Sequence, residues 1–306
     1  MGVAEIEVWR GGVATWECDQ MGHLNVGFYV AKSMQALAGM AAELGMPGAF
    51  APTAEATLLV REQHIRFLRE AHPGAPLHIT GGVVEIGETE ARLLLLMHHH
   101  SGELAASFQT VVAHATARDG RAFPWPDRIL RRAEALKVEI PDRAAPKSIG
   151  LGPVETQASL ERANALGLTR TGLGVIGAAD CDAFGRMRTE GFMHRLSDGI
   201  PHFFAGRRPG QTEGGPRVGG AALEYRLVHH AWPRAGDRIE LRSGSAGGDA
   251  RFRRLAHWLL DPETGRPWGS AEAIAVSFDL DTRKIIALSG DELARVEADA
   301  IPDLGL

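Results

Sequence analysis

The chain has 306 residues, of which 44% are hydrophobic and 23% charged, and its formal net charge is -5. This length allows two domains, and the small negative charge gives no reason to expect a nucleic-acid partner. No apolar run is long enough to span a membrane, no signal-peptide pattern opens the chain, and two cysteines make no disulfide framework. We therefore expect a cytoplasmic protein with neither a membrane nor a nucleic acid as partner.

The first elements lead up to a distinctive turn. A short strand is predicted over residues 5–14, and the chain then reads Cys-Asp-Gln-Met-Gly-His-Leu-Asn from Cys18 to Asn25. Asp19 stands before a predicted helix start, and Gly22 supplies the turn. Apolar residues follow on nearly all sides from 24 to 44, with hardly any charge, which predicts a helix surrounded by protein.

A run of β-rich segments comes next, bounded by turn signals. We predict strands over residues 57–68, 77–86, 91–100 and 105–117. The three consecutive histidines at 98–100 are expected to end a strand, because neighbours on a strand point to opposite faces. Residues 127–138 are predicted to form a covering helix, followed by an extended, proline-marked linker.

The same order recurs in the second half, which indicates an internal duplication. Cys181, Asp182 and Gly185 repeat the turn at an offset of 163 residues, and Tyr225-Arg226-Leu227 is matched to Ile65-Arg66-Phe67 at an offset of 160. The second copy is predicted to have a helix cut short by Pro201. Its strands are predicted at 173–179, 222–229, 238–245, 251–260 and 269–279. The predicted domains are residues 1–145 and 154–306, joined by a linker at 146–153.

The pattern Asp-x-x-Gly-His-x-Asn, followed by an aromatic residue and an apolar helix, resembles the hotdog-fold acyl-CoA thioesterases of the 4-hydroxybenzoyl-CoA type. The resemblance implies an α+β fold of two tandem hotdog domains, each an antiparallel sheet wrapped around a central helix, packed as a pseudo-dimer. It implies hydrolysis of an acyl-CoA to a free acid and CoA. No metal-spaced cluster or phosphate loop is apparent, so we expect no metal or redox cofactor, and CoA only as part of the substrate.

The resemblance also assigns roles to residues of the first copy. Asp19 would be the catalytic carboxylate, acting as nucleophile or as general base on water. His23 and Asn25 would orient the thioester or the water. The amides at the start of the helix would polarise the thioester carbonyl. The remaining matched positions would bind the substrate, and these are Gly22, Val26, Gly27 and Tyr29. The alternative reading is that Asp19 is a helix N-cap and His23 a hydrogen-bonded structural residue.

The second copy departs from the motif, since arginines stand where His23 and Asn25 would fall. Asp182 and Glu190 are kept as catalytic candidates, because Glu190, His194 and Asp198 form a polar stripe at helical spacing. That stripe would either line an altered active site or be a solvated face with local ion pairs. Arg66 and Arg226 would bind the phosphates of CoA, unless they are ordinary strand residues.

Two other functions remain open at this point. A hotdog hydratase or dehydratase is suggested by His202-Phe203-Phe204 followed by Pro209-Gly210, although the spacing is imperfect. The other is a non-catalytic acyl-CoA-binding protein. The sequence does not fix the acyl group, the choice between CoA and acyl-carrier-protein thioesters, whether one copy or both are active, or whether the chain forms a homo-oligomer.

Overall fold

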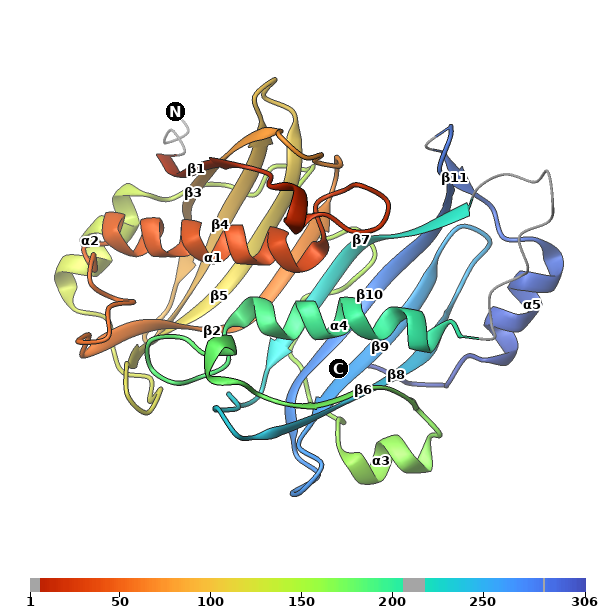
Figure 1. Ribbon diagram of the computed structural model, residues 1–306. Coiled ribbons are helices and arrows are strands. Elements are labelled where there is room, and N and C mark those ends of the chain that lie inside the picture. Colours follow the sequence, from red (N-terminus) through yellow and green to blue (C-terminus); the bar gives the residue numbers. More distant parts are fainter. Residues whose placement is uncertain (1–5, 206–217, 283) are drawn as a thin grey trace. The chain divides into compact units, whose positions relative to one another are not determined.

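The computed structural model describes residues 6–205, 218–282 and 284–306 (Figure 1). The chain forms two compact units. The first unit contains Met1–Pro146 and Gly177–Ser197, and the second contains Lys147–Ile176 and Asp198–Leu306. Among the helices of the described residues, none has the length and apolarity needed to cross a membrane.

The first unit holds an antiparallel sheet in the order β1-β3-β4-β5-β2. Its strands agree closely with the predicted ones, and β4 ends at the second of the three consecutive histidines. The strands are β1 (Ile6–Gly12), β2 (Ala56–Phe67), β3 (Pro76–Ile86), β4 (Glu90–His99) and β5 (Leu104–Thr116).

Helix α1 (Val26–Glu43) covers one face of this sheet. A Cβ on Gly81 of β3 would lie 2.7 Å from the sulfur of Met40 in α1, whereas a Cβ on Gly82 would lie 2.4 Å from Val138. Successive strand residues point to opposite faces, so α1 lies on one face and the segment after α2 (Asp127–Ala135) on the other. This is the predicted order of a sheet around a central helix with a second, covering helix.

Lys32 is buried in the middle of this apolar helix, with only 5% of its side chain exposed. Its ammonium group donates to both carboxylate oxygens of Glu17 at 2.8 Å. Glu17 ends the short 3-10 turn η1 (Thr15–Glu17), accepts the amide of Ala14, and provides the carbonyl that accepts the amide of Asn25. One ion pair therefore fastens the segment that carries Asp19 to the central helix.

The duplication repeats this fastening at the predicted offset of 163 residues. Asp180, at the end of η2 (Ala178–Asp180), accepts the amide of Gly177 and lies 3.4 Å from the guanidinium of Arg195. Arg195 belongs to α4 (Thr189–Phe203), which contains Pro201 and ends two residues after it, as the sequence indicated. This second pair is more exposed, with 27% and 46% of its side chains accessible.

The strands of the second unit are also antiparallel, in the order β7-β10-β9-β8-β6, with β11 beside β10. A Cβ on Gly199 of α4 would meet Leu241 of β8, whereas a Cβ on Gly244 would meet Leu168 and Leu304. Opposite faces of β8 are therefore covered by the end of α4 and by the segments around α3 and the C-terminus. The elements are α3 (Leu160–Ala165), β6 (Thr169–Val175), β7 (Val218–His229), β8 (Arg238–Gly248), β9 (Arg253–Leu260), β10 (Pro267–Asp279), β11 (Ile285–Ile286) and α5 (Gly290–Ala298).

Two details of the predicted repeat are wrong. Strand β6 ends at Val175, four residues earlier than predicted. The reason is that Gly177 is the N-cap of η2 and its amide donates to the Asp180 side chain. In the sheets, Arg66 lies opposite Ser107 while Val228 lies opposite Ser270. Since these serines correspond at an offset of 163, Arg66 corresponds to Val228 rather than to Arg226. The sequence comparison missed this shift of two residues because an Arg occurs in both strands.

The core of the second unit contains a buried polar chain. Ser243 lies 3.0 Å from the hydroxyl of Thr171 and 2.8 Å from Nδ1 of His257, through its own hydroxyl. His257 is only 1% exposed, and its Nε2 has no hydrogen-bond partner within the described residues. Burial lowers the pKa of His257 from its ordinary 6.5 to about 4.

Replacing Lys32 by Met should destabilise the chain by about 3–5 kcal/mol, because Glu17 is left charged in a buried place without its partner. Urea denaturation followed by fluorescence measures this loss. The matched change Arg195→Met should cost no more than about 1 kcal/mol, since the second pair is partly solvated. The double change Lys32→Met with Glu17→Leu should recover most of the loss. Equal losses for Lys32→Met and Arg195→Met would contradict the role given to burial.

Stability should fall as pH drops from about 6.5 towards about 4, by up to about 3 kcal/mol from His257 alone. In that window the unfolded chain binds a proton at this imidazole and the folded chain does not, so protonation favours unfolding. Urea denaturation at pH 7 and pH 5 measures the change. His257→Gln should lose less stability than the wild type between these two values, and an identical pH dependence in the variant would show that His257 does not cause it.

Candidate active site

Asp19 sits in a tight loop that closes on itself before α1. Its Oδ1 accepts the amides of Met21 at 2.8 Å and His23 at 3.2 Å, while its own amide donates to the His23 carbonyl at 2.8 Å. Gly22 has φ 77°, a left-handed conformation that glycine adopts without strain. The loop therefore fixes one carboxylate oxygen, and no hydrogen bond reaches the other, Oδ2, from the described part of the chain.

Asn25, and not Asp19, caps α1, which corrects the predicted helix start. The Asn25 side chain accepts the amide of Gly27 and donates to Ser197 Oγ, both at 2.9 Å. The oxygen and the nitrogen of the Asn25 side chain therefore both make structural hydrogen bonds, which explain this residue without a direct part in catalysis. Most of the free amides expected around Leu24 to Gly27 are instead paired. Leu24, Asn25 and Gly27 donate to other groups, whereas the Val26 amide has no partner within the described residues.

Tyr29 joins the Asp19 loop to the segment between β2 and β3. Its buried hydroxyl donates to the Arg69 carbonyl and accepts the amide of Ala71, and the Ala71 carbonyl accepts the amide of Leu24 at 2.8 Å. Burial raises the pKa of Tyr29 well above its usual value, so the phenol stays neutral. Tyr29, predicted to bind substrate, is therefore seen to position a neighbouring segment.

That segment brings Glu70 and His72 to His23. Nε2 of His23 lies 3.5 Å from a carboxylate oxygen of Glu70, and the rings of His23 and His72 meet edge to face at 5.0 Å. His23 is only 6% exposed, whereas 39% of the Glu70 side chain is accessible. Sequence reasoning missed both Glu70 and His72, because neither lies in the motif that carries Asp19.

The second copy keeps the loop and changes its chemistry. Oδ1 of Asp182 accepts the amides of Phe184 and Arg186, and Gly185 has φ 75°, so the backbone repeats that of the first copy. The difference lies at Oδ2, which is 3.3 Å from Nε of Arg186, the residue that replaces His23. The Asp182 carboxylate is thus neutralised by a buried guanidinium, whereas the corresponding oxygen of Asp19 is left available.

The polar stripe on α4 divides between two environments. Glu190 lies 3.6 Å from the guanidinium of Arg188, which is the local ion pair considered as an alternative. His194 instead packs against the start of α1. Its ring meets Phe28 edge to face at 4.8 Å, and a Cβ on Gly27 would lie 2.2 Å from its Nδ1. Gly27 is therefore required to admit this imidazole, which gives the predicted glycine a steric role.

The two arginines predicted to bind phosphates hold the predicted linker and the residues just before it. Arg66 donates to the carbonyls of Arg143 and Ala145. Arg226 is 5% exposed and donates to the carbonyls of Gly150 and Gly152. These contacts account for both guanidinium groups without a substrate. Of the hydratase-like pattern, Pro209 and Gly210 lie outside the described residues.

Cys18 is a small, partly buried neighbour of Asp19 whose thiol faces the Ala14 carbonyl at 3.6 Å. Burial and the adjacent Asp19 carboxylate raise the pKa of the Cys18 thiol. A neutral thiol is a poor nucleophile. Asp19 therefore stays the better candidate for attack.

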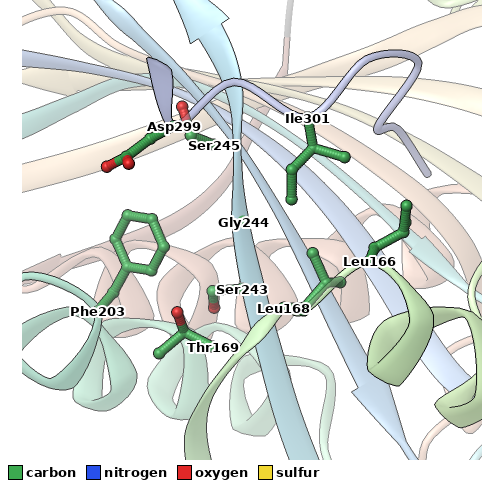
Figure 2. Close-up of a pocket in the computed structure, with 10 residues that line it drawn as sticks. Leu166, Leu168, Thr169, Phe203, Ser243, Gly244, Ser245, Asp299 and Ile301 are labelled. Carbon is green, nitrogen blue, oxygen red and sulfur yellow. The ribbon is translucent and has the colours of Figure 1, made fainter. Parts of the chain in front are cut away.

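The second unit contains a hollow of about 210 Å³ beside the end of α4 (Figure 2). Leu166, Leu168 and Ile301 face Phe203 across it, and Ser243 of the buried polar chain forms part of its wall. None of the predicted site residues lines it. Its lining mixes these apolar side chains with polar ones, Thr169, Ser243, Ser245 and Asp299, and no acid or base of the candidate active site is among its lining residues.

Known proteins give a consistent family and fold. The sequence matches the thioesterase-like superfamily over residues 13–133 and again over 176–301. None of the curated proteins matches it significantly. An acyl-ACP thioesterase from Bacteroides thetaiotaomicron has a similar structure, with a TM-score of 0.65 at 11% identity, covering 87% of this chain and 96% of that one. The 12:0-ACP thioesterase from Umbellularia californica has a TM-score of 0.64 at 11% identity, covering 88% and 93%.

Both copies of the predicted repeat are matched by the family, and the similar solved structures extend over nearly the whole chain. The α+β fold of two tandem hotdog domains is confirmed. The chain belongs to the thioesterase-like superfamily and is a thioester hydrolase.

Proposed function

We propose that the chain hydrolyses an acyl-CoA at the mouth of α1, with Asp19 as the reacting carboxylate. The observation that carries this proposal is the contrast between the two copies. Both loops hold Oδ1 of the aspartate with backbone amides, but Oδ2 is paired with Arg186 in the second copy, whereas in the first it has no partner among the described residues. The first copy is therefore the active one in this proposal, and Asp182 and Glu190 take no part in the reaction.

Two routes fit the geometry of Asp19. In the first, Oδ2 attacks the thioester carbon, expels the thiolate and forms a mixed anhydride that water then hydrolyses. In the second, Oδ2 takes a proton from water, which attacks the same carbon. Either route develops negative charge on the carbonyl oxygen. The Val26 amide, at the positive end of α1, is placed to stabilise that charge in our proposal.

His23 would act beside Asp19, since the two residues pair through their backbones. We assign His23 the task of orienting the thioester or the water, with Glu70 holding its ring from the other side. Asn25 and Tyr29 would contribute indirectly, by fixing the start of α1 and the segment that carries Glu70.

The carrier of the acyl group is a further part of the proposal. Two similar proteins are named as thioesterases of acyl-ACP, and the motif resembles thioesterases of acyl-CoA. Both carriers present the acyl group on the same type of pantetheine thiol, so one active site can accept the reacting end of either. Initial rates with CoA and ACP thioesters of one acyl group, repeated for short, long and aromatic acyl groups, would identify the carrier and the chain.

Asp19→Asn should lower the rate of thiol release from an acyl-CoA by about a hundredfold or more. The amide oxygen still accepts the Met21 and His23 amides, so the loop and the melting temperature should be preserved. The matched control is Asp182→Asn, which removes the same charge from the second copy and should leave turnover close to that of the wild type. Unchanged turnover in Asp19→Asn, or a collapse in Asp182→Asn alone, would refute the assignment.

A further inference from the structure

Three side chains with metal-binding donors meet beside the candidate active site. The ligand atoms of His23, Glu70 and His72 all lie within 4.8 Å of one another. They come from two segments that the chain ties together through the Leu24–Ala71 hydrogen bond and the hydroxyl of Tyr29. The donors are therefore held close together by buried structure, although Glu70 and His72 themselves reach solvent.

The hydrogen bond of His72 favours the tautomer of this side chain that binds a metal. Nδ1 of His72 lies 3.2 Å from the carbonyl oxygen of Gly22, and a carbonyl can only accept. The proton of neutral His72 is thus placed on Nδ1, which leaves a lone pair on Nε2. A backbone carbonyl that fixes the tautomer in this way is a common feature of histidines that bind metals. Nε2 of His23 faces the Glu70 carboxylate 3.5 Å away, so a metal ion that binds there would displace the proton between them.

The donor set also has the right composition. Two imidazoles and one carboxylate form a standard set of protein ligands for Zn²⁺, with the fourth position left to water or another ligand. Neighbouring ligands of a tetrahedral zinc ion lie roughly 3.3–3.5 Å apart, from metal–ligand bonds of about 2.0–2.2 Å. The His23–Glu70 separation already has this value, and all three ligand atoms lie within 4.8 Å of one another.

The second copy supplies a contrast within the same chain. The loop offset of 163 replaces His23 by Arg186, and the sheet offset of 162 places Trp232 and Arg234 at the positions of Glu70 and His72. None of these three residues is a usual metal ligand at neutral pH. The cluster therefore belongs to the first copy, the one that contains Asp19.

We propose that His23, Glu70 and His72 bind Zn²⁺, and that an occupied site suppresses thioester hydrolysis. Coordination displaces the proton on Nε2 of His23 and holds this ring at the metal, so His23 can no longer orient the thioester or the water. The inhibition rests on the proposed function, whereas the binding does not. Zn²⁺ would thus act as a reversible inhibitor that enters from the solvent side through Glu70 and His72.

Binding is tested on the full chain after treatment with a chelator. Titration calorimetry with Zn²⁺ and visible absorption with Co²⁺, which shows ligand-field bands in a four-coordinate site, report occupancy without any substrate. His72→Gln should weaken Zn²⁺ binding at least about tenfold, since it removes one ligand while keeping a donor for Gly22. His98→Gln is the control, because His98 stacks on His78 elsewhere on the first unit and could bind metal adventitiously. Equal affinity in wild type and His72→Gln, or loss only in His98→Gln, would overturn the site.

Inhibition is tested by following the ultraviolet absorbance of an acyl-CoA thioester, which avoids thiol reagents that bind zinc. Zn²⁺ should lower turnover of the wild type and of His98→Gln over the concentration range in which it binds. The turnover of His72→Gln, expressed relative to its own rate without metal, should resist inhibition over the Zn²⁺ range that inhibits the wild type. Unchanged or faster turnover of the zinc-loaded wild type would overturn the regulatory role. If no thioester is hydrolysed under any condition, the proposed function fails, and the binding titrations still decide the metal site.

Discussion

The ion pair between Lys32 and Glu17 is the interaction on which the candidate active site depends. A buried lysine in an apolar helix is costly unless a carboxylate meets it, so the helix can pack only with Glu17 in place. Glu17 in turn holds the amides on both sides of the Asp19 loop, through its side chain to Ala14 and its carbonyl to Asn25. The same ion pair is therefore needed both to pack the helix in the core and to place the Asp19 carboxylate.

The duplication shows how such a framework can be kept while its chemistry is lost. Both loops have the same glycine conformation, the same aspartate turn and the same fastening of a carboxylate to the central helix. Among the substitutions between them, the replacement of His23 by Arg186 changes the chemistry, since its guanidinium lies 3.3 Å from the second carboxylate oxygen of Asp182. The aspartate is retained because its turn needs Oδ1, and this structural need persists whether or not Oδ2 reacts.

Much of this could be predicted from the sequence, because local patterns carry it. The apolar helix, the alternating strands and the repeated Asp-Gly turn each depend on neighbours in the chain. The contribution of Lys32 could also have been foreseen, since a lone charge in a helix surrounded by protein requires a partner. Glu70, His72 and the contacts of His194 could not, because they depend on which distant segments the fold brings together. The same limit explains why Arg66 was wrongly matched to Arg226, because the correspondence between the two copies is set by the pairing of strands.

The surroundings of His23 connect the reaction with its proposed control. Hydrogen bonds through Tyr29 and Ala71 join the segment that carries Glu70 to the loop that carries Asp19. A ligand that shifts one of these segments would therefore also shift the other. Glu70 is close enough to orient His23 and exposed enough to meet an ion from solvent. An imidazole that faces a carboxylate at 3.5 Å can be oriented by it for catalysis or join it in binding a cation, but it cannot do both at once. Competition between these two states of one residue is what would make the site switchable.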